Sequence, residues 1–293
     1  MSQNAVDTPW TLELLLGLFD VTPADADRFT ADTGIAGDEG RVVVEGTQVL
    51  AQAIVAAAKR FPDKSIRSAQ AVFARVVTVG PVVVFDVDVV QEGRSTATAV
   101  VTASQNGKRC VTVTVLADVP TADLITHHRP RADVVPPDSA FDGRMPLRGR
   151  DIRVVEVEDV NSPDEVGPPE LHAWLRYDPV PDRADLAKAL LAHFTGHLGI
   201  STTMRAHAGI GTSQAHVTVS TAPMTLAISF HEPVRWDGWI LYSHESTQAG
   251  AGMSYVRGTV HTEDGALLAS FAQDGLVRPL RASDSAVEST ARL

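Results

Sequence analysis

Residues 46–60 read Gly46-Thr-Gln-Val-Leu-Ala-Gln-Ala-Ile-Val-Ala-Ala-Ala-Lys-Arg60, and this stretch decides the fold. Its larger apolar residues recur on one helical face, which predicts an α-helix from Gly46 to Arg60. Nearly every residue in it is small or apolar, so the helix is only weakly amphipathic. We therefore expect it to be buried on most sides, with the rest of the chain built around it.

Segments rich in Val and Thr follow this helix and predict β-strands. Asn106-Gly107 separates two of them, and Asn-Gly between such segments is a strong signal for a two-residue hairpin turn. Before the long helix, an apolar stripe from Thr11 to Phe19 predicts a shorter helix. A buried helix followed by an antiparallel meander is the plan of the hotdog fold, in which a curved sheet wraps around a central helix. The predicted strands are Ala69–Val79, Val82–Gln91, Ser95–Gln105 and Lys108–Ala117.

The second half of the chain repeats this order. A helix is predicted from Arg183 to Leu198. Gly265 lies 158 residues after Gly107, and Phe230 lies 157 residues after Phe73. This near-constant spacing indicates an internal duplication. The predicted fold is therefore an α+β double hotdog, with two curved antiparallel sheets each wrapped around a central helix. The strands of the second half are Thr225–Pro233, Trp239–Glu245, Ala251–Thr262 and Leu267–Leu276.

The duplication divides the chain into an N-terminal hotdog over residues 1–119, a connection over residues 120–150 and a C-terminal hotdog over residues 151–293. Prolines and mixed polarity in the connection predict a segment that runs over the surface. It contains His127-His128, but adjacent side chains point in different directions and make a poor pair of metal ligands. No metal site and no cofactor is expected.

The charge of the chain limits its partners. There are 36 acidic and 25 basic residues, which give a net charge of −11, and no run of Lys or Arg occurs. Such a surface repels phosphodiester backbones, so nucleic acid is not an expected partner. Cys110 is the single cysteine, which excludes an intrachain disulfide and favours a reducing compartment. Residues 1–10 lack a signal-peptide pattern and no apolar run reaches about 18 residues, so we expect a cytoplasmic protein without a membrane span.

Several local motifs, in order along most of residues 10 to 280, resemble the acyl-CoA thioesterase II family. This resemblance implies a double hotdog, an acyl-CoA substrate, hydrolysis of its thioester by an activated water and a place in lipid metabolism. The matching stretches are Gly46-Thr-Gln-Val-Leu-Ala-Gln52, Val90-Gln-Glu-Gly-Arg-Ser95, Ala103-Ser-Gln-Asn-Gly107, Gly167-Pro-Pro-Glu-Leu-His-Ala-Trp174, Phe230-His-Glu-Pro233, Trp239-Ile-Leu-Tyr242, Glu245-Ser-Thr247, Val256-Arg-Gly258 and Ala269-Ser-Phe-Ala-Gln-Asp-Gly-Leu-Val-Arg278.

In that family, hydrolysis is attributed to an Asp near the end of the second helix, a Thr or Ser on the next strand and a Gln on the last strand. The resemblance places the Gln at Gln273, whose counterpart in the first half is Val115. Gly196 stands at the Asp position and has no side chain to act as a base. His197, one residue after it, and His193, three residues before it, are candidate substitutes, because an imidazole with an ordinary pKa near ~6.5 can accept a proton at neutral pH.

At the hydroxyl position the resemblance places Pro223. Thr225 lies two residues further on and Thr221 two residues before, and a shift of two keeps the same face of a strand. Either could supply the hydroxyl, and Thr225 is the first candidate. The residues expected to bind the substrate are Gly196, Gln48, Thr247 and Arg257, the last of these through a phosphate or by orienting the sheet.

Because only one of the three family positions is unchanged, two further readings stay open. One is a non-hydrolytic acyl-CoA or acyl-carrier binding protein that has lost its catalytic base. The other is a hotdog enoyl-CoA hydratase or dehydratase. The resemblance also leaves homo-oligomer formation open.

Overall fold

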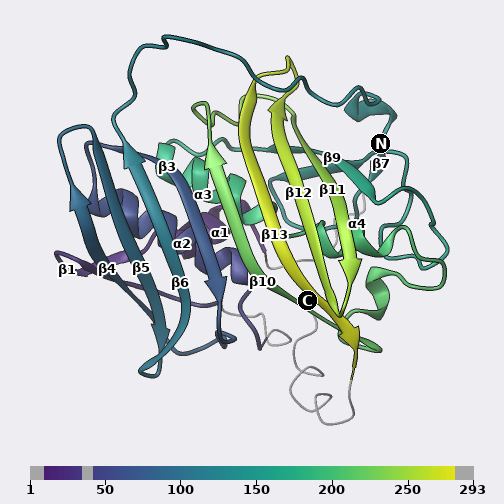
Figure 1. Cartoon of the computed structure of the whole chain (residues 1–293), viewed down its shortest axis with the longest axis horizontal. Helices are drawn as coiled ribbons and strands as arrows, with labels where there is room; N and C mark the ends of the chain where they lie inside the picture. Colours follow the sequence, from purple (N-terminus) through teal and green to yellow (C-terminus); the bar gives the residue numbers. More distant parts are fainter. Residues whose placement is uncertain (1–9, 35–41, 281–293) are drawn as a thin grey trace.

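The computed structural model describes residues 10–34 and 42–280. Its strands form one antiparallel sheet of thirteen strands, and the helices lie together behind that sheet in the view of Figure 1. The strand order is β1-β2-β4-β5-β6-β3-β10-β13-β12-β11-β9-β8-β7. In the described part of the chain no helix is long and apolar enough to cross a membrane.

The helices are α1 (Leu12–Phe19), α2 (Gly46–Arg60), α3 (Ala184–Phe194) and α4 (Gly199–Met204), with 3-10 turns η1 (Pro137–Ser139) and η2 (Thr212–Gln214). The strands are β1 (Thr22–Asp25), β2 (Arg28–Ala31), β3 (Ser65–Phe73), β4 (Val83–Glu92), β5 (Thr96–Gln105), β6 (Lys108–Asp118), β7 (Phe141–Asp142), β8 (Arg150–Val154), β9 (Glu170–Tyr177), β10 (Val219–Phe230), β11 (Ile240–Gly250), β12 (Met253–Thr262) and β13 (Leu267–Pro279).

The two halves share a single sheet, whereas the sequence predicted two. Strands β3 and β10 pair antiparallel, from Ser68 opposite Ser229 to Val72 opposite Thr225. The physical reason is that each half would otherwise end in an edge strand with unpaired N–H and C=O groups. Pairing the two edges satisfies both of them. We call this β3–β10 junction the seam.

Counted outward from the seam, the strand order is the same in both halves. Strands β3, β6, β5, β4 and β2 lie on one side, and β10, β13, β12, β11 and β9 lie on the other. At the middle of the seam Gln70 pairs with Ala227, flanked by Ala69 with Ile228 and by Ala71 with Leu226. The two halves are therefore related by an approximate twofold axis that passes through the seam, as an internal duplication requires.

Most predicted elements are present, although several strands have shifted bounds and the second long helix differs in extent. The long helix has the predicted bounds, and Asn106 and Gly107 both have positive φ angles of 51° and 73°, as a two-residue hairpin turn requires. The helix predicted from Arg183 to Leu198 is wrong in extent, because it ends at Phe194 and a short second helix begins at Gly199. The interruption contains Gly196, which has little helix propensity.

Helix α2 is buried as its composition predicts. Residues 47 to 57 are all buried, and the helix packs against β3, β4, β5 and β6 on one side and against α3 on another. Its polar residues are paired with main-chain groups: Gln52 Nε2 donates to the carbonyl oxygens of Leu18, at 2.8 Å, and Asp32, at 3.0 Å. These bonds also hold the chain before α2 against the helix.

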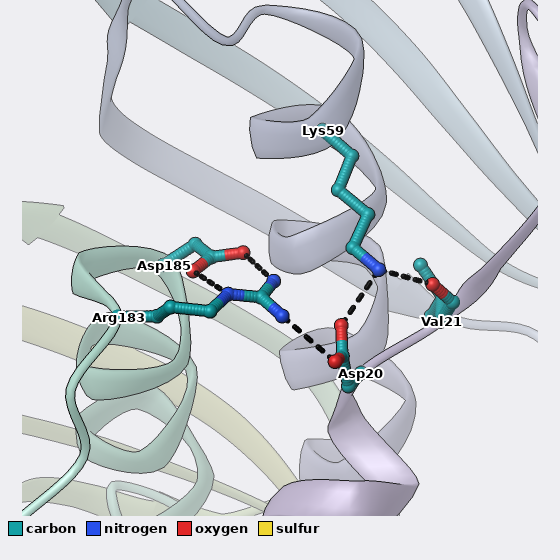
Figure 2. Close-up of polar contacts among 5 residues, drawn as sticks. All are labelled: Asp20, Val21, Lys59, Arg183 and Asp185. Carbon is teal, nitrogen blue, oxygen red and sulfur yellow. Dashed lines mark hydrogen bonds and ion pairs between the residues drawn. The ribbon is translucent and has the colours of Figure 1, made fainter.

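An ion-pair cluster fastens the C-terminal end of α2 to α1 and α3 (Figure 2). Asp20 follows α1 and lies 2.6 Å from Lys59 Nζ of α2 and 2.7 Å from Arg183 Nη1 at the start of α3. Arg183 also pairs with Asp185 at 2.6 Å. Burial opposes ionisation of Asp20, but the two cations together hold its pKa below the usual value. The cluster therefore joins three helices at this end of the α2–α3 pair.

The segment between the halves is mostly exposed but is attached to the second half. Trp174 Nε1 of β9 donates to the carbonyl oxygen of Val135, and His261 of β12 lies 3.0 Å from the carbonyl oxygen of Arg129. His127 and His128 are exposed.

Lys188 of α3 provides a test of the seam through its titration. Its Nζ donates to Ser65 Oγ and to the carbonyl oxygen of Ile66 on β3, and it lies 5.1 Å from the Phe230 ring centroid. Burial, aided by the charge of Arg67, lowers the Lys188 pKa from 10.5 to about 8. The folded state then releases this proton before the unfolded state does, so stability rises with pH between these two values.

We expect wild type to gain up to about 3 kcal/mol of unfolding free energy relative to Lys188→Met between about pH 8 and about pH 10.5. Urea unfolding of both proteins across this range measures the difference, and groups common to both cancel. Parallel stability curves for the two proteins would show that Lys188 has an ordinary pKa.

Candidate functional site

Gln273 of β13 is a buried polar side chain on the helix-covered face of the sheet. It pairs with Leu226 of β10 and Val256 of β12 and is 3% exposed. Its Oε1 is buried and has no hydrogen-bond partner among the residues that the structure describes. In the first half, Val115 occupies the equivalent place between Ala69 and Ala99. The polar position therefore exists in the second half, where the resemblance placed it.

The residue that faces Gln273 is Gly199, the first residue of α4. A Cβ atom built on Gly199 would lie 2.9 Å from Gln273 Oε1. A Cβ atom on Gly196 would instead lie 2.5 Å from Thr47 Cγ2, at the start of α2. The family resemblance put the missing carboxylate at Gly196, but the structure brings Gly199, not Gly196, next to Gln273. The short interruption between α3 and α4 accounts for the difference of three positions.

These contacts place the α3–α4 junction between Gln273 of β13 on one side and the start of α2 on the other. A Cβ atom on Gly46 would lie 2.9 Å from the Phe73 ring, so α2 begins close to the end of β3. Gln48 is buried, and its Nε2 lies 3.4 Å from the carbonyl oxygen of Thr33. The Gln48 amide therefore holds the chain before α2.

His197 lies in the α3–α4 junction and is partly buried, with 16% of its side chain exposed. Its Nδ1 donates to the carbonyl oxygen of His193 at 3.1 Å, and its ring stacks on Phe194 with centroids 4.9 Å apart. Burial lowers the His197 pKa to about 3, against a smaller opposing effect of Glu45. The ring is therefore neutral at neutral pH and holds a proton weakly. This does not fit the expectation of a base with an ordinary imidazole pKa.

Glu45, which the sequence did not single out, joins both candidate histidines in a cluster around this ring. His193 Nε2 lies 2.8 Å from Glu45 Oε2, and His197 Nε2 lies 3.7 Å from the same oxygen. Glu45 directly precedes α2, so the cluster joins the start of α2 to the end of α3. The four-residue spacing of the two histidines was the available signal. Glu45 could not be found in this way because it lies far away in the sequence.

Thr225 does not lie with Gln273. Its Oγ1 donates to Asp274 Oδ2 at 2.6 Å. Asp274 directly follows Gln273 on β13, and successive residues of a strand point to opposite faces. Thr225 and Asp274 therefore share the outer face of the sheet, while Gln273 points inward. Pro223 pairs with Gly275, on the face of Gln273, and offers no hydroxyl.

The two remaining expected substrate-binding residues also lie apart from Gln273. Arg257 follows Val256, the β12 partner of Gln273, and so points to the outer face. It is 54% exposed and makes a two-pronged ion pair with Glu245. Thr247 is exposed at an irregularity in the pairing of β11. Neither reaches the inner face on which Gln273 lies.

Other polar residues of β11 do share that face, and the sequence did not single them out. Ser246 pairs with Val256, and its Oγ lies 3.1 Å from Thr203 Oγ1 of α4. His244 is fully buried, its ring packs edge-on against Phe271, and neither ring nitrogen has a hydrogen-bond partner among the described residues. Burial lowers its pKa to about 4, so this ring is neutral.

The chain belongs to the acyl-CoA thioesterase family. The sequence model described as the acyl-CoA thioesterase N-terminal domain matches residues 38–117, and the one described as the C-terminal domain matches residues 115–277. Among curated proteins, the chain is 28% identical over 268 residues to acyl-CoA thioesterase 2 of Haemophilus influenzae, covering 84% of this chain and 91% of that protein. It is 25% identical over 260 residues to mouse acyl-coenzyme A thioesterase 8, covering 80% of this chain and 79% of that protein.

Solved structures show the same fold. A tesB protein of Mycobacterium avium subs paratuberculosis superposes with a TM-score of 0.78 at 22% identity, covering 92% of this chain and 100% of that one. An acyl-CoA thioesterase II of Mycobacterium marinum superposes with a TM-score of 0.76 at 23% identity, covering 91% of this chain and 98% of that one. A protein of Alicyclobacillus acidocaldarius described as having a hot dog fold superposes with a TM-score of 0.73 at 19% identity, covering 92% of this chain and 99% of that one. The fold is that of the hotdog thioesterases.

Replacing Thr225 by Val tests the placement of this residue on the outer face. We expect acyl-CoA hydrolysis to change less than twofold, while the free energy of unfolding falls by about 1–2 kcal/mol because Asp274 loses its hydrogen bond. A thiol-release assay and urea unfolding measure the two effects. Loss of hydrolysis without loss of stability would place Thr225 in the reaction instead.

Proposed function

We propose that the chain hydrolyses acyl-CoA thioesters with water at a site centred on Gln273. Membership of the acyl-CoA thioesterase family supports the reaction and the substrate class. The observation that supports the place is the buried, unpartnered Oε1 of Gln273, since a buried acceptor without a partner is costly unless something binds there. A water in contact with this oxygen would satisfy it.

The surrounding groups suit attack on a thioester. A glutamine amide can accept a hydrogen bond from water and donate one to an oxygen, so Gln273 can orient the attacking water. The first N–H groups of a helix lack intrahelical partners, so the start of α2 can stabilise the negative charge that develops on the carbonyl oxygen. Water adds to the carbonyl carbon, the carbon–sulfur bond breaks and the CoA thiol leaves with a proton.

A glycine stands beside Gln273 where the family resemblance implies an acidic residue. Gly199 stands where a side chain would touch the amide, and His197, the base expected from the sequence, holds a proton weakly. We therefore propose a slow hydrolase rather than a fast one. The two other readings, a non-hydrolytic acyl-CoA or acyl-carrier binding protein and an enoyl-CoA hydratase, are not favoured by the family or by its named relatives.

We also propose that the shared sheet consists of two hotdog units, over residues 1–119 and 151–293, joined by residues 120–150. The packing of α2 on β3, β4, β5 and β6 supports the first unit. In the second unit, Tyr242 of β11 donates from its hydroxyl to the carbonyl oxygen of Leu191, and Trp236 Nε1 donates to that of Ala187, which ties α3 to its own strands.

Replacing Gln273 by Ala tests the site. We expect kcat on a panel of acyl-CoAs to fall by about 10²–10³-fold, as is typical when one preorganised polar group is lost. Gln70→Ala is the matched control, because Gln70 is an exposed glutamine of the same sheet and should leave kcat unchanged. Thiol release at saturating substrate is the measurement. Wild-type protein without activity on every chain length would contradict the proposed function itself.

Replacing Gly199 by Asp tests which glycine occupies the place of the missing carboxylate. The new side chain meets only the flexible end of Gln273, and a positioned general base typically contributes about 10²–10⁴-fold, so we expect kcat to rise by at least about 10-fold. Gly196→Asp is the paired control, because its Cβ would collide with Thr47, and its nearest neighbours do not include Gln273. A larger increase in kcat from Gly196→Asp than from Gly199→Asp would instead support Gly196 as the position of the missing carboxylate.

A further inference from the structure

The cluster of Glu45, His193 and His197 has the geometry of a metal-binding site. One carboxylate oxygen and two imidazole nitrogens, one from each residue, lie within 4.8 Å of one another. Glu45 Oε2 lies 2.8 Å from His193 Nε2 and 3.7 Å from His197 Nε2. The two rings are 4.7 Å apart between centroids and are inclined by 69°. Small movements of these side chains would place all three atoms around one ion.

The donor set itself selects a class of ion. Two imidazoles and one carboxylate bind Zn²⁺ and related divalent transition metals, and a site with three protein ligands keeps a position for water or another ligand. His193 and His197 are four residues apart, a spacing that puts both rings on one side of a helical turn. The third ligand, Glu45, directly precedes α2, a helix that is buried over residues 47 to 57.

The hydrogen bonds of the cluster support the same reading. His197 Nδ1 donates to the carbonyl oxygen of His193, which leaves the lone pair on Nε2, the atom that faces Glu45. Metal-binding histidines are commonly oriented in this way by a hydrogen bond from the other ring nitrogen. His193 is 4% exposed, and its Nδ1 has no hydrogen-bond partner among the described residues. That ring is a buried polar group that its protein contacts do not satisfy completely.

The surroundings are closed and mainly aromatic. The Phe19 ring lies 5.1 Å from His193, and Phe194 stacks on His197. Arg150 approaches the same region, with its guanidinium carbon 5.8 Å from the Phe194 ring centroid. The negative charge beside the two imidazoles comes from the Glu45 carboxylate, 2.8 Å from His193 Nε2 and 3.7 Å from His197 Nε2.

We propose that Glu45, His193 and His197 bind one divalent transition-metal ion, with Zn²⁺ as the class that the donor set fits. The site adjoins Gly196, whose place beside Thr47 links it to the start of α2. The inference does not depend on hydrolysis, because binding is measured directly on the protein.

The test uses the full chain, stripped with a chelator and then titrated with Zn²⁺ in a calorimeter. We expect about one ion per chain in wild type. His197→Asn and the nearly isosteric Glu45→Gln should each weaken binding by more than the roughly 10–100-fold that loss of an outer hydrogen bond costs. Replacement by Co²⁺ should give the visible absorption bands of a low-coordinate site in wild type and not in Glu45→Gln.

The control is the double variant His127→Asn with His128→Asn, which removes the exposed histidine pair and should bind Zn²⁺ like wild type. Circular dichroism shows whether each variant is folded. If His197→Asn is unfolded, the Zn²⁺ affinity of Glu45→Gln tests the proposal. Saturating Zn²⁺ should also raise the melting temperature of wild type but not of Glu45→Gln. Wild type that binds no Zn²⁺, or binding that survives both cluster variants, overturns the proposal.

Discussion

The architecture depends on the burial of α2. A helix of small and apolar residues has no face suited to water, so it needs a sheet on one side and a second helix on the other. Strands β3 to β6 cover it from the first half, and α3 covers it from the second. The amide nitrogen of its buried Gln52 donates to two main-chain carbonyl groups. The seam then completes the enclosure by making one sheet from two edges.

The position of the site follows from this helix pair. The start of α2 lies beside the end of α3, and the α3–α4 junction, with its small residues, lies between these ends and the sheet. Polar groups meet there, including Gln273 and the Glu45–His193 pair. At the opposite end, Asp20, Lys59 and Arg183 fasten the helices together (Figure 2). One end of the pair is thus held by partly buried charges, and the other contains polar groups that include the buried Gln273 and His193.

Periodicity and turn chemistry were enough to predict α2 to the residue and the Asn106-Gly107 hairpin, because both are local properties. The family resemblance pointed to Gln273, which lies on the inner face of the sheet, but it could not distinguish Gly196 from Gly199, since a short break in a helix changes which residue faces a strand. Thr225 lies on the other face from Gln273 because the pairing of β10 is irregular between Pro223 and Thr225. Glu45 and His193 are 148 positions apart, so no local pattern could join them.

Val115 and Gln273 occupy equivalent places, yet one is apolar and the other is polar. In a symmetric dimer of identical subunits every substitution is made twice, once in each copy of the interface. A chain that carries both halves is free of this restriction, and each half can diverge separately. Joining the halves in one chain prevents them from dissociating and also lets them specialise. The second half can then carry the polar site residue while the first half provides structural support.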